Sequence, residues 1–216
     1  MLVDIDLSDY YNAGYMLVKI TDRASCMNDN VLPQKILSVS ACICDQFPFE
    51  VKKARESLHI DNKTFKVMKK WVQVKINEGK IFCNSLFIDL SDIKEFYNLF
   101  FTNLNQIKII GLNIHKKYFD IIIEEENNHS YGVAEVIKPK RPADSTGKIL
   151  GYEILGDFHS YICNGLEDDY YKEFNLKLNS NGFISSLEES EMLANYTNEN
   201  ELGEPVFWLS WLIIEY

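Results

Sequence analysis

The last part of the chain places the strongest limit on its fold. Residues 206–216 read VFWLSWLIIEY, and Glu215 is their single charged side chain. A run this apolar is unsuited to the exposed edge of a sheet, and it is about half as long as the roughly 20 residues that a membrane-spanning helix needs. We therefore expect a buried C-terminal strand.

Strand and helix patterns are mixed along the rest of the chain. We expect strands at residues 14–20, 80–89, 106–115 and 148–155, and helices at 33–45, 61–79, 91–101, 164–174 and 186–196. Residues 116–126 fit a helix or a strand, and their acidic ending favours a helix. The stretch 139–147 contains two prolines and small polar residues, so it is the best candidate for a loop or a subdomain boundary. Because strands and helices do not alternate regularly, the sequence predicts a single α+β domain over residues 1–216, with a mixed or antiparallel sheet and flanking helices.

Composition is typical of a folded cytosolic protein. Of the 216 residues, 46% are hydrophobic and 25% are charged, which provides a core and excludes a disordered chain. The N-terminal residues are acidic, unlike a signal peptide. Five cysteines, an odd number, lie in apolar surroundings and indicate reduced thiols rather than a disulfide framework. We expect a cytoplasmic location.

Charge is distributed unevenly along the chain. Residues 1–150 contain 20 basic and 19 acidic side chains, whereas residues 151–216 contain 2 basic and 13 acidic ones, a net charge of −11. Such a region repels nucleic acids and anionic membranes and attracts a basic partner. An acidic surface that only aids solubility is the alternative. The nine basic residues between positions 50 and 80 are interpreted as a solvated helix face.

Two acidic groups in this region are the candidate partner-binding residues. Consecutive carboxylates repel each other and rarely act as an acid–base pair, and no calcium-binding loop motif accompanies them. We therefore expect an exposed docking surface for a basic protein. The candidates are Glu167, Asp168, Asp169, Glu188, Glu189 and Glu191.

The common catalytic motifs are absent from the sequence. It lacks a phosphate-binding P-loop, a GxGxxG motif, a GxSxG motif and paired zinc ligands, so we expect no cofactor and no metal. His159 and Cys163 are four residues apart and could share a helical face, which leaves a hydrolase as an alternative. Asp157, His159 and Ser160 are the residue types of a catalytic triad, but triads are recognised by geometry rather than by adjacency.

The C-terminal third also carries a family pattern. The pattern comprises residues 147–156 (GKILGYEILG), 158–161 (FHSY), 163–167 (CNGLE) and 181–184 (NGFI), then an acidic helix, and finally 204–205 (EP) before 208–214 (WLSWLII). Further matching positions near the N-terminus are Tyr15, Leu17, Leu32, Pro33 and Cys42. This pattern resembles a family of bacterial immunity proteins, which are encoded beside polymorphic or contact-dependent growth-inhibition toxins. Ser210 and Tyr161 stand where the family pattern leads us to expect proline and tryptophan.

The resemblance implies a protein without enzymatic activity that binds one cognate toxin domain in the cytosol and neutralises it. Many such toxins are basic nucleases, with which an acidic region is compatible. An interaction module for another basic partner is the second hypothesis, and a hydrolase that uses His159 and Cys163 is the third.

Overall fold

The computed structural model describes residues 5–37, 39, 59–82, 86–102, 104–125 and 133–216. The strands are β1 (Tyr10–Asp22), β2 (Lys35–Leu37), β3 (Ile81–Phe82), β4 (Leu86–Phe87), β5 (Ile107–His115), β6 (Lys148–Gly156), β7 (His159–Ser160) and β8 (Trp208–Glu215). The α-helices are α2 (Asn62–Asn77), α3 (Leu90–Phe100), α4 (Phe119–Glu125), α5 (Val133–Ile137), α6 (Glu167–Phe174) and α7 (Leu187–Glu199). Short 3₁₀ helices are η1 (Leu7–Asp9), η2 (Lys116–Tyr118) and η3 (Tyr161–Asn164).

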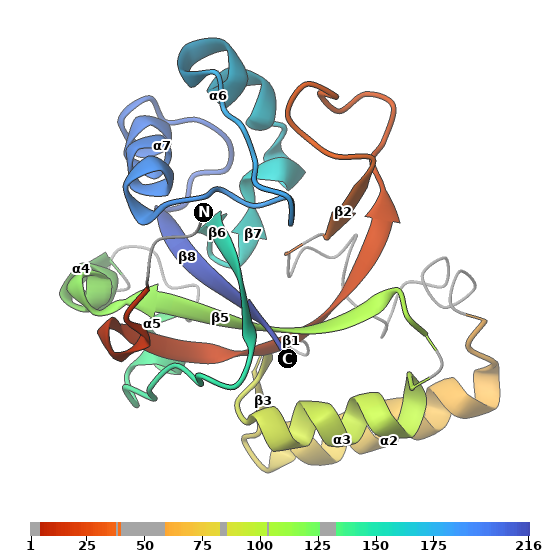
Figure 1. The fold of residues 1–216 in the computed structure, drawn as a ribbon. Helices are drawn as coiled ribbons and strands as arrows, with labels where there is room; N and C mark the ends of the chain where they lie inside the picture. Colours follow the sequence, from red (N-terminus) through yellow and green to blue (C-terminus); the bar gives the residue numbers. More distant parts are fainter. Residues whose placement is uncertain (1–4, 38, 40–58, 83–85, 103, 126–132) are drawn as a thin grey trace.

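The strands form one antiparallel sheet in the order β3-β4-β1-β5-β8-β6-β7, with β2 paired to the C-terminal end of β1. In Figure 1, α6 and α7 lie at the top of the view and α2 and α3 at the bottom, with the sheet between them. The predicted α+β fold with an antiparallel sheet and flanking helices, in one compact unit, is confirmed.

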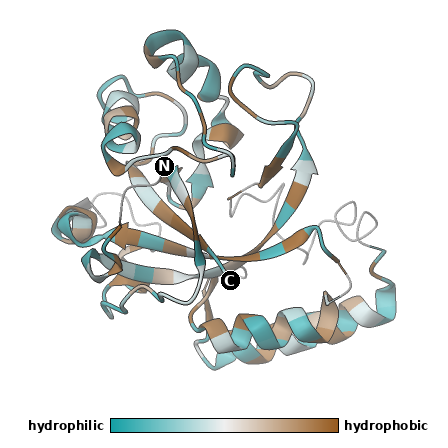
Figure 2. Cartoon of the chain, in the orientation of Figure 1, coloured by the Kyte–Doolittle hydropathy of each residue, from teal (hydrophilic) through white to brown (hydrophobic). Residues whose placement is uncertain are grey.

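Strand β8 has the buried, central position that its composition predicts. It pairs with β5 on one side and with β6 on the other. Leu209, Trp211 and Ile213 belong to one hydrophobic cluster, whereas Trp208 and Leu212 belong to another, so the strand is covered on both faces. Figure 2 shows the hydrophobic residues along the central strands and mainly hydrophilic ones on α6. Without this double cover, so apolar a strand would expose its aromatic side chains to water.

Three hydrophobic clusters hold the helices on the sheet. The first lies under α4 and α5, the second joins α6 and α7 to β6 and β8, and the third lies between the α2–α3 pair and β1, β4 and β5. The core stripe expected on α2 is confirmed, since Met68 and Val72 are buried, while Lys63, Lys66 and Lys70 are exposed as a solvated face.

Most expected elements are present within a few residues of their predicted limits, but two differ, and the short elements α5 and β7 were not expected. Residues 35–37 form the strand β2 rather than a helix, because β1 extends beyond β5 and its Ile20 pairs with Leu37. The rest of that expected helix, from residue 40 onward, lies outside the described residues. The single strand expected at residues 80–89 is instead the antiparallel pair β3 and β4.

The segment at residues 139–147 lies against the start of β1. The amide of Asn12 donates to the carbonyl of Arg141 at 2.7 Å, and the Arg141 guanidinium donates to the carbonyl of Ala13 at 2.9 Å. Hydrogen bonds to the backbone therefore join this proline-containing segment to the sheet. A subdomain boundary there stays a prediction.

Candidate functional site

Helix α7 is the element that organises the acidic C-terminal residues. Ser186 caps its N-terminus, where the Ser186 hydroxyl accepts from the amide of Glu189 at 3.2 Å. Ser190, Leu193, Ala194 and Thr197 face inward and are buried, and the Ser190 hydroxyl bonds to the Ser210 hydroxyl of β8. The opposite side of the helix is therefore free to form a surface.

The outward stripe of α7 consists of Glu188, Met192, Asn195 and Glu199, all exposed. These residues are four, three and four positions apart, which places them on one helix face. Met192 is 43% exposed. Met192 lies off the apolar side of the helix, because Leu193 and Ala194 fill the inward positions and each step along a helix turns the side chain by about 100°.

The three predicted carboxylates on α6 are mostly used within the molecule. Glu167 is 4% exposed, and burial raises the pKa of its carboxyl. Asp168 accepts from the Asn28 amide at 2.7 Å, and Asp169 is half-buried. All three lie in the first turn of α6, where carboxylates stabilise the helix dipole. Their expected exposure as a docking surface is wrong for Glu167 and only partial for the other two.

The predicted carboxylates on α7 also differ in how far they are exposed to solvent. Burial raises the pKa of the half-buried Glu189. Glu191 forms an ion pair with Lys117 and accepts a hydrogen bond from the Tyr118 hydroxyl. Of the six candidate residues, Glu188 alone is classed as exposed rather than partly or fully buried.

A cavity of about 300 Å³ adjoins Glu188 at the N-terminal end of α7. Its acidic lining residues are Asp6, Asp9 and Glu188, and its aromatic lining residues are Tyr10, Tyr152 and His115. The Tyr10 and Tyr152 hydroxyls are 2.9 Å apart. Burial and the nearby Lys117 lower the pKa of His115, whose Nδ1 accepts from the Lys117 amide, so this imidazole adds no positive charge at neutral pH.

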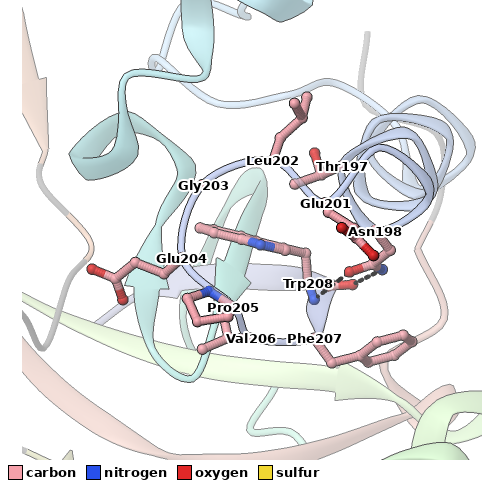
Figure 3. Close-up of a pocket in the computed structure, with 10 residues that line it drawn as sticks. All are labelled: Thr197, Asn198, Glu201, Leu202, Gly203, Glu204, Pro205, Val206, Phe207 and Trp208. Atoms are coloured by element: carbon pink, nitrogen blue, oxygen red, sulfur yellow. Dashed lines mark hydrogen bonds between the residues drawn. The ribbon is translucent and has the colours of Figure 1, made fainter.

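A second cavity, of about 550 Å³, lies at the C-terminal end of the same helix. Figure 3 shows the Trp208 indole across the middle of the ring of lining residues, with Glu204 and Glu201 on opposite sides of it. Apolar walls come from Leu202, Pro205, Val206 and Phe207. A 13-residue helix is about 20 Å long, so α7 places two acid-lined cavities roughly that far apart.

The sequence analysis did not identify Asp6, Asp9, Glu201 or Glu204 as site residues. Asp6 and Asp9 lie at the other end of the chain from α7, and the sheet brings them together by pairing β1 with β5 and β5 with β8. Glu201 and Glu204 are isolated carboxylates, so no run of acidic residues marks them. The absence of lysine and arginine after Lys177 is the one sequence signal that covers the second cavity.

The residues of the hydrolase hypothesis lie in a different arrangement from the expected one. His159 is on β7 and Cys163 is in η3, so they do not share an α-helical face. The Ser160 hydroxyl donates to the buried Glu153 carboxyl, whereas His159 Nδ1 lies 3.4 Å from Glu204. Adjacent residues of a strand point to opposite faces, which separates Ser160 from His159. The triad-like order of residue types therefore does not form a catalytic unit.

The chain was compared with known proteins. No family model, curated protein or solved structure matches it. The resemblance to immunity proteins thus rests on the sequence pattern alone. Within the described residues, no group of three or more histidine, cysteine, aspartate or glutamate side chains could hold a metal ion. In the same part of the chain, every helix is too short or too polar to cross a membrane.

Proposed function

We propose that the protein is an immunity protein that binds and neutralises a cognate toxin domain, a basic nuclease, in the cytosol. One observation carries the proposal: neither the outward stripe of α7 nor the cavities at its two ends include a lysine or arginine. Six exposed or cavity-lining carboxylates surround this surface, from Asp6, Asp9, Glu188, Glu199, Glu201 and Glu204.

The same surface has the other properties of a protein interface. Met192 supplies an exposed, adaptable apolar side chain at its centre, and Tyr10, Tyr152 and Phe207 supply aromatic edges in the cavities. Its carboxylates attract a basic partner during approach and discourage an acidic one. Beneath the surface, α7 packs on β8 and is joined to it through the Ser190–Ser210 hydrogen bond. Such a surface needs little rearrangement to bind, which favours high affinity.

The partner can be identified by affinity capture from the native host, with the full-length protein as bait and moderate salt in the wash. We expect one retained protein that carries a toxin domain encoded beside this gene, with loss of its toxicity on addition of the bait. Retention of a basic partner without a toxin domain would support the alternative of a general interaction module. Turnover of a substrate that His159→Ala abolishes, with the fold intact, would instead favour the hydrolase.

Charge reversal should locate the interface. We expect the triple variant Glu188→Lys, Glu199→Lys, Glu201→Lys to associate with the toxin at least about tenfold more slowly than the wild type at low salt, because electrostatic steering is lost. Stopped-flow or surface-plasmon measurements over a salt series would give the rates, and the difference should shrink at high salt.

A matched control changes the same number of charges elsewhere. Glu78, Glu95 and Glu135 are exposed and lie on or beside α2, α3 and α5. Their conversion to lysine should slow association much less, because these positions are away from α7. Equal rates for the two triple variants would place the interface elsewhere on the molecule.

A further inference from the structure

The outer face of α2 combines exposed apolar and basic side chains. It consists of Lys63, Val67, Lys70 and Val74, which are four, three and four positions apart and so lie on one side of the helix. Val67 is 54% exposed and Val74 is 47% exposed. With Leu99 of α3, three of the five large hydrophobic side chains that are exposed in the described residues lie on this helix pair. Single exposed apolar residues are common, but a concentration of them favours an interaction surface.

The other side of α2 is fixed to α3. Met68 is buried in a hydrophobic cluster that also contains Phe96 of α3, and the ring centroids of Trp71 and Phe96 are 4.9 Å apart. Lys75 of α2 forms an ion pair with Asp92 of α3. These inward contacts hold the outer face of α2 in a defined position.

Two charges near the ends of α2 lie opposite to the preference of the helix dipole. The basic Lys63 follows the N-cap Asp61 in the first turn, and the acidic Glu78 is the C-cap residue. Both side chains are exposed. Glu78 lies 3.5 Å from Lys80, but their side chains are 46% and 41% exposed, and surface pairs of this kind contribute little to stability. Both Lys63 and Glu78 can therefore pair with another molecule at little cost.

The outer face of α2 is complementary to itself when two copies of the helix run antiparallel. With a twofold axis between residues 70 and 71, Val67 faces Val74 of the second copy and Lys63 faces Glu78 of the second copy. Symmetry repeats both contacts at the other end, about 22 Å away. Lys70 lies beside the axis, where its aliphatic part can cover apolar surface while its ammonium group reaches solvent. In a parallel pair, Lys63 would instead face Lys63.

We propose that α2 is a self-association face, at which a second copy of the chain binds in the antiparallel direction. Val67 and Val74 pack across the twofold axis, and Lys63 of each copy pairs with Glu78 of the other. One helix face is small for an interface, so we expect a weak dimer with a Kd of the order of 100 µM. Figure 1 shows α2 and α7 on opposite sides of the sheet, so the dimer leaves both α7 surfaces open.

Sedimentation velocity of the full-length protein between about 5 and 500 µM would measure this association. We expect the sedimentation coefficient to rise with concentration from the monomer value towards the dimer value. The double variant Val67→Gln, Val74→Gln should associate at least about tenfold more weakly, because glutamine removes the apolar contact while it keeps a good helix propensity. Ile121→Gln is the matched control, since Ile121 is 42% exposed on α4, and this variant should associate like the wild type. Circular dichroism would check that each variant is folded.

Exchange of the two charges tests the antiparallel alignment. Lys63→Glu and Glu78→Lys should each weaken dimerisation at least about threefold, because two like-charge contacts replace two ion pairs. The double variant Lys63→Glu, Glu78→Lys should associate like the wild type, since opposite charges face each other again. Such a recovery identifies a contact between these two positions, because independent effects of the two substitutions would add.

Three results would overturn the proposal. These are a protein that stays monomeric up to about 500 µM, unchanged association of the Val67→Gln, Val74→Gln variant, and a double charge variant as weak as the single ones. Binding of a monomeric protein to phosphatidylglycerol vesicles, lost in the Val67→Gln, Val74→Gln variant, would assign the face to an anionic lipid surface instead.

The inference is independent of the proposed function. Self-association is measured without a toxin, so it can be found in a protein that captures none. Conversely, the variants of α2 should bind a captured toxin at the rate of the wild type, because the α7 surface is unchanged in them.

Discussion

Replacement of Glu153 by glutamine should stabilise the protein at pH 8 much more than at pH 5. The free energy of unfolding of the variant minus that of the wild type should be roughly 3 kcal/mol larger at pH 8 than at pH 5. Glu153 lies on β6 opposite Trp211 of β8 and is 2% exposed. Burial raises the pKa of its carboxyl to about 8, and the hydrogen bond from the Ser160 hydroxyl offsets only part of this increase.

The direction of this pH dependence follows from the number of protons bound by the folded and unfolded states. In the unfolded chain this carboxyl ionises near its ordinary pKa of 4.5, whereas in the folded protein it stays protonated up to about pH 8. Between these values the unfolded state binds fewer protons than the folded state, so the free energy of unfolding falls as pH rises. Glutamine cannot ionise, so the variant lacks this loss of stability.

Urea denaturation at pH 5, 6.5 and 8 would measure the effect on the free energy of unfolding. Glu188→Gln is the control, since Glu188 is exposed and its removal should leave the pH profile of the wild type unchanged. If wild type and Glu153→Gln had parallel profiles over this range, the carboxyl of Glu153 would be ionised in the folded protein.

Gly151→Ala should reduce the free energy of unfolding by roughly 3–5 kcal/mol. Gly151 lies at a bulge of β6, with a φ of +138° that side-chain-bearing residues rarely adopt. A Cβ atom there would lie 2.6 Å from the carbonyl oxygen of Ile184 and 2.8 Å from Cβ of Phe183. The segment with Ile184 is bonded to β6 through two backbone hydrogen bonds with Tyr152, so it cannot easily move away.

Gly165→Ala provides the comparison that separates backbone strain from steric overlap. Gly165 ends η3 with a φ of +70°, but a Cβ atom at this position meets no other atom within 4 Å. We expect a loss of only about 1–2 kcal/mol from the unfavourable conformation. Thermal and urea denaturation of both variants would test this order, and a similar loss in both would show that the contact with residues 183–184 contributes little.

The sequence predicted the fold where a local pattern and the tertiary environment agree. Apart from Ser210, the run that ends in Ile214 is apolar on both faces, which favours a strand covered on both sides. In α2, Met68 and Val72 recur at helical spacing and Asp61 caps the N-terminus, accepting from the amides of Lys63 and Thr64.

Prediction failed where a long-range pairing decided between two local possibilities. Ile36 and Leu37 fit one side of a helix and also fit alternate faces of a strand. The free edge of β1 beyond β5 favours the strand, and no local pattern reports the length of β1. The five-residue α5 is too short to produce a helical periodicity, so it left no signal in the sequence.

The negative charge of the candidate site could be predicted from the sequence, but the positions and exposure of its carboxylates could not. An acidic C-terminal region was evident from composition, and Glu188 is exposed as expected. Carboxylates are exposed in most proteins, so nothing in the sequence marks Glu167 as buried or Glu191 as paired with Lys117. The contribution of Asp6 and Asp9 depends on the pairing of distant strands, which is a property of the fold.

The short outer strands of the sheet limit how another protein can bind. Within the described residues, β3 and β7 each contain two residues, and the side strand β2 contains three. Backbone recognition by strand addition needs a longer row of unpaired amide and carbonyl groups at a sheet edge. Under the proposed function, the short outer strands favour selection of the partner by side chains on helices and loops. Substitutions at a few of these surface positions can then redirect the protein to a new partner during evolution while the sheet and its core stay unchanged.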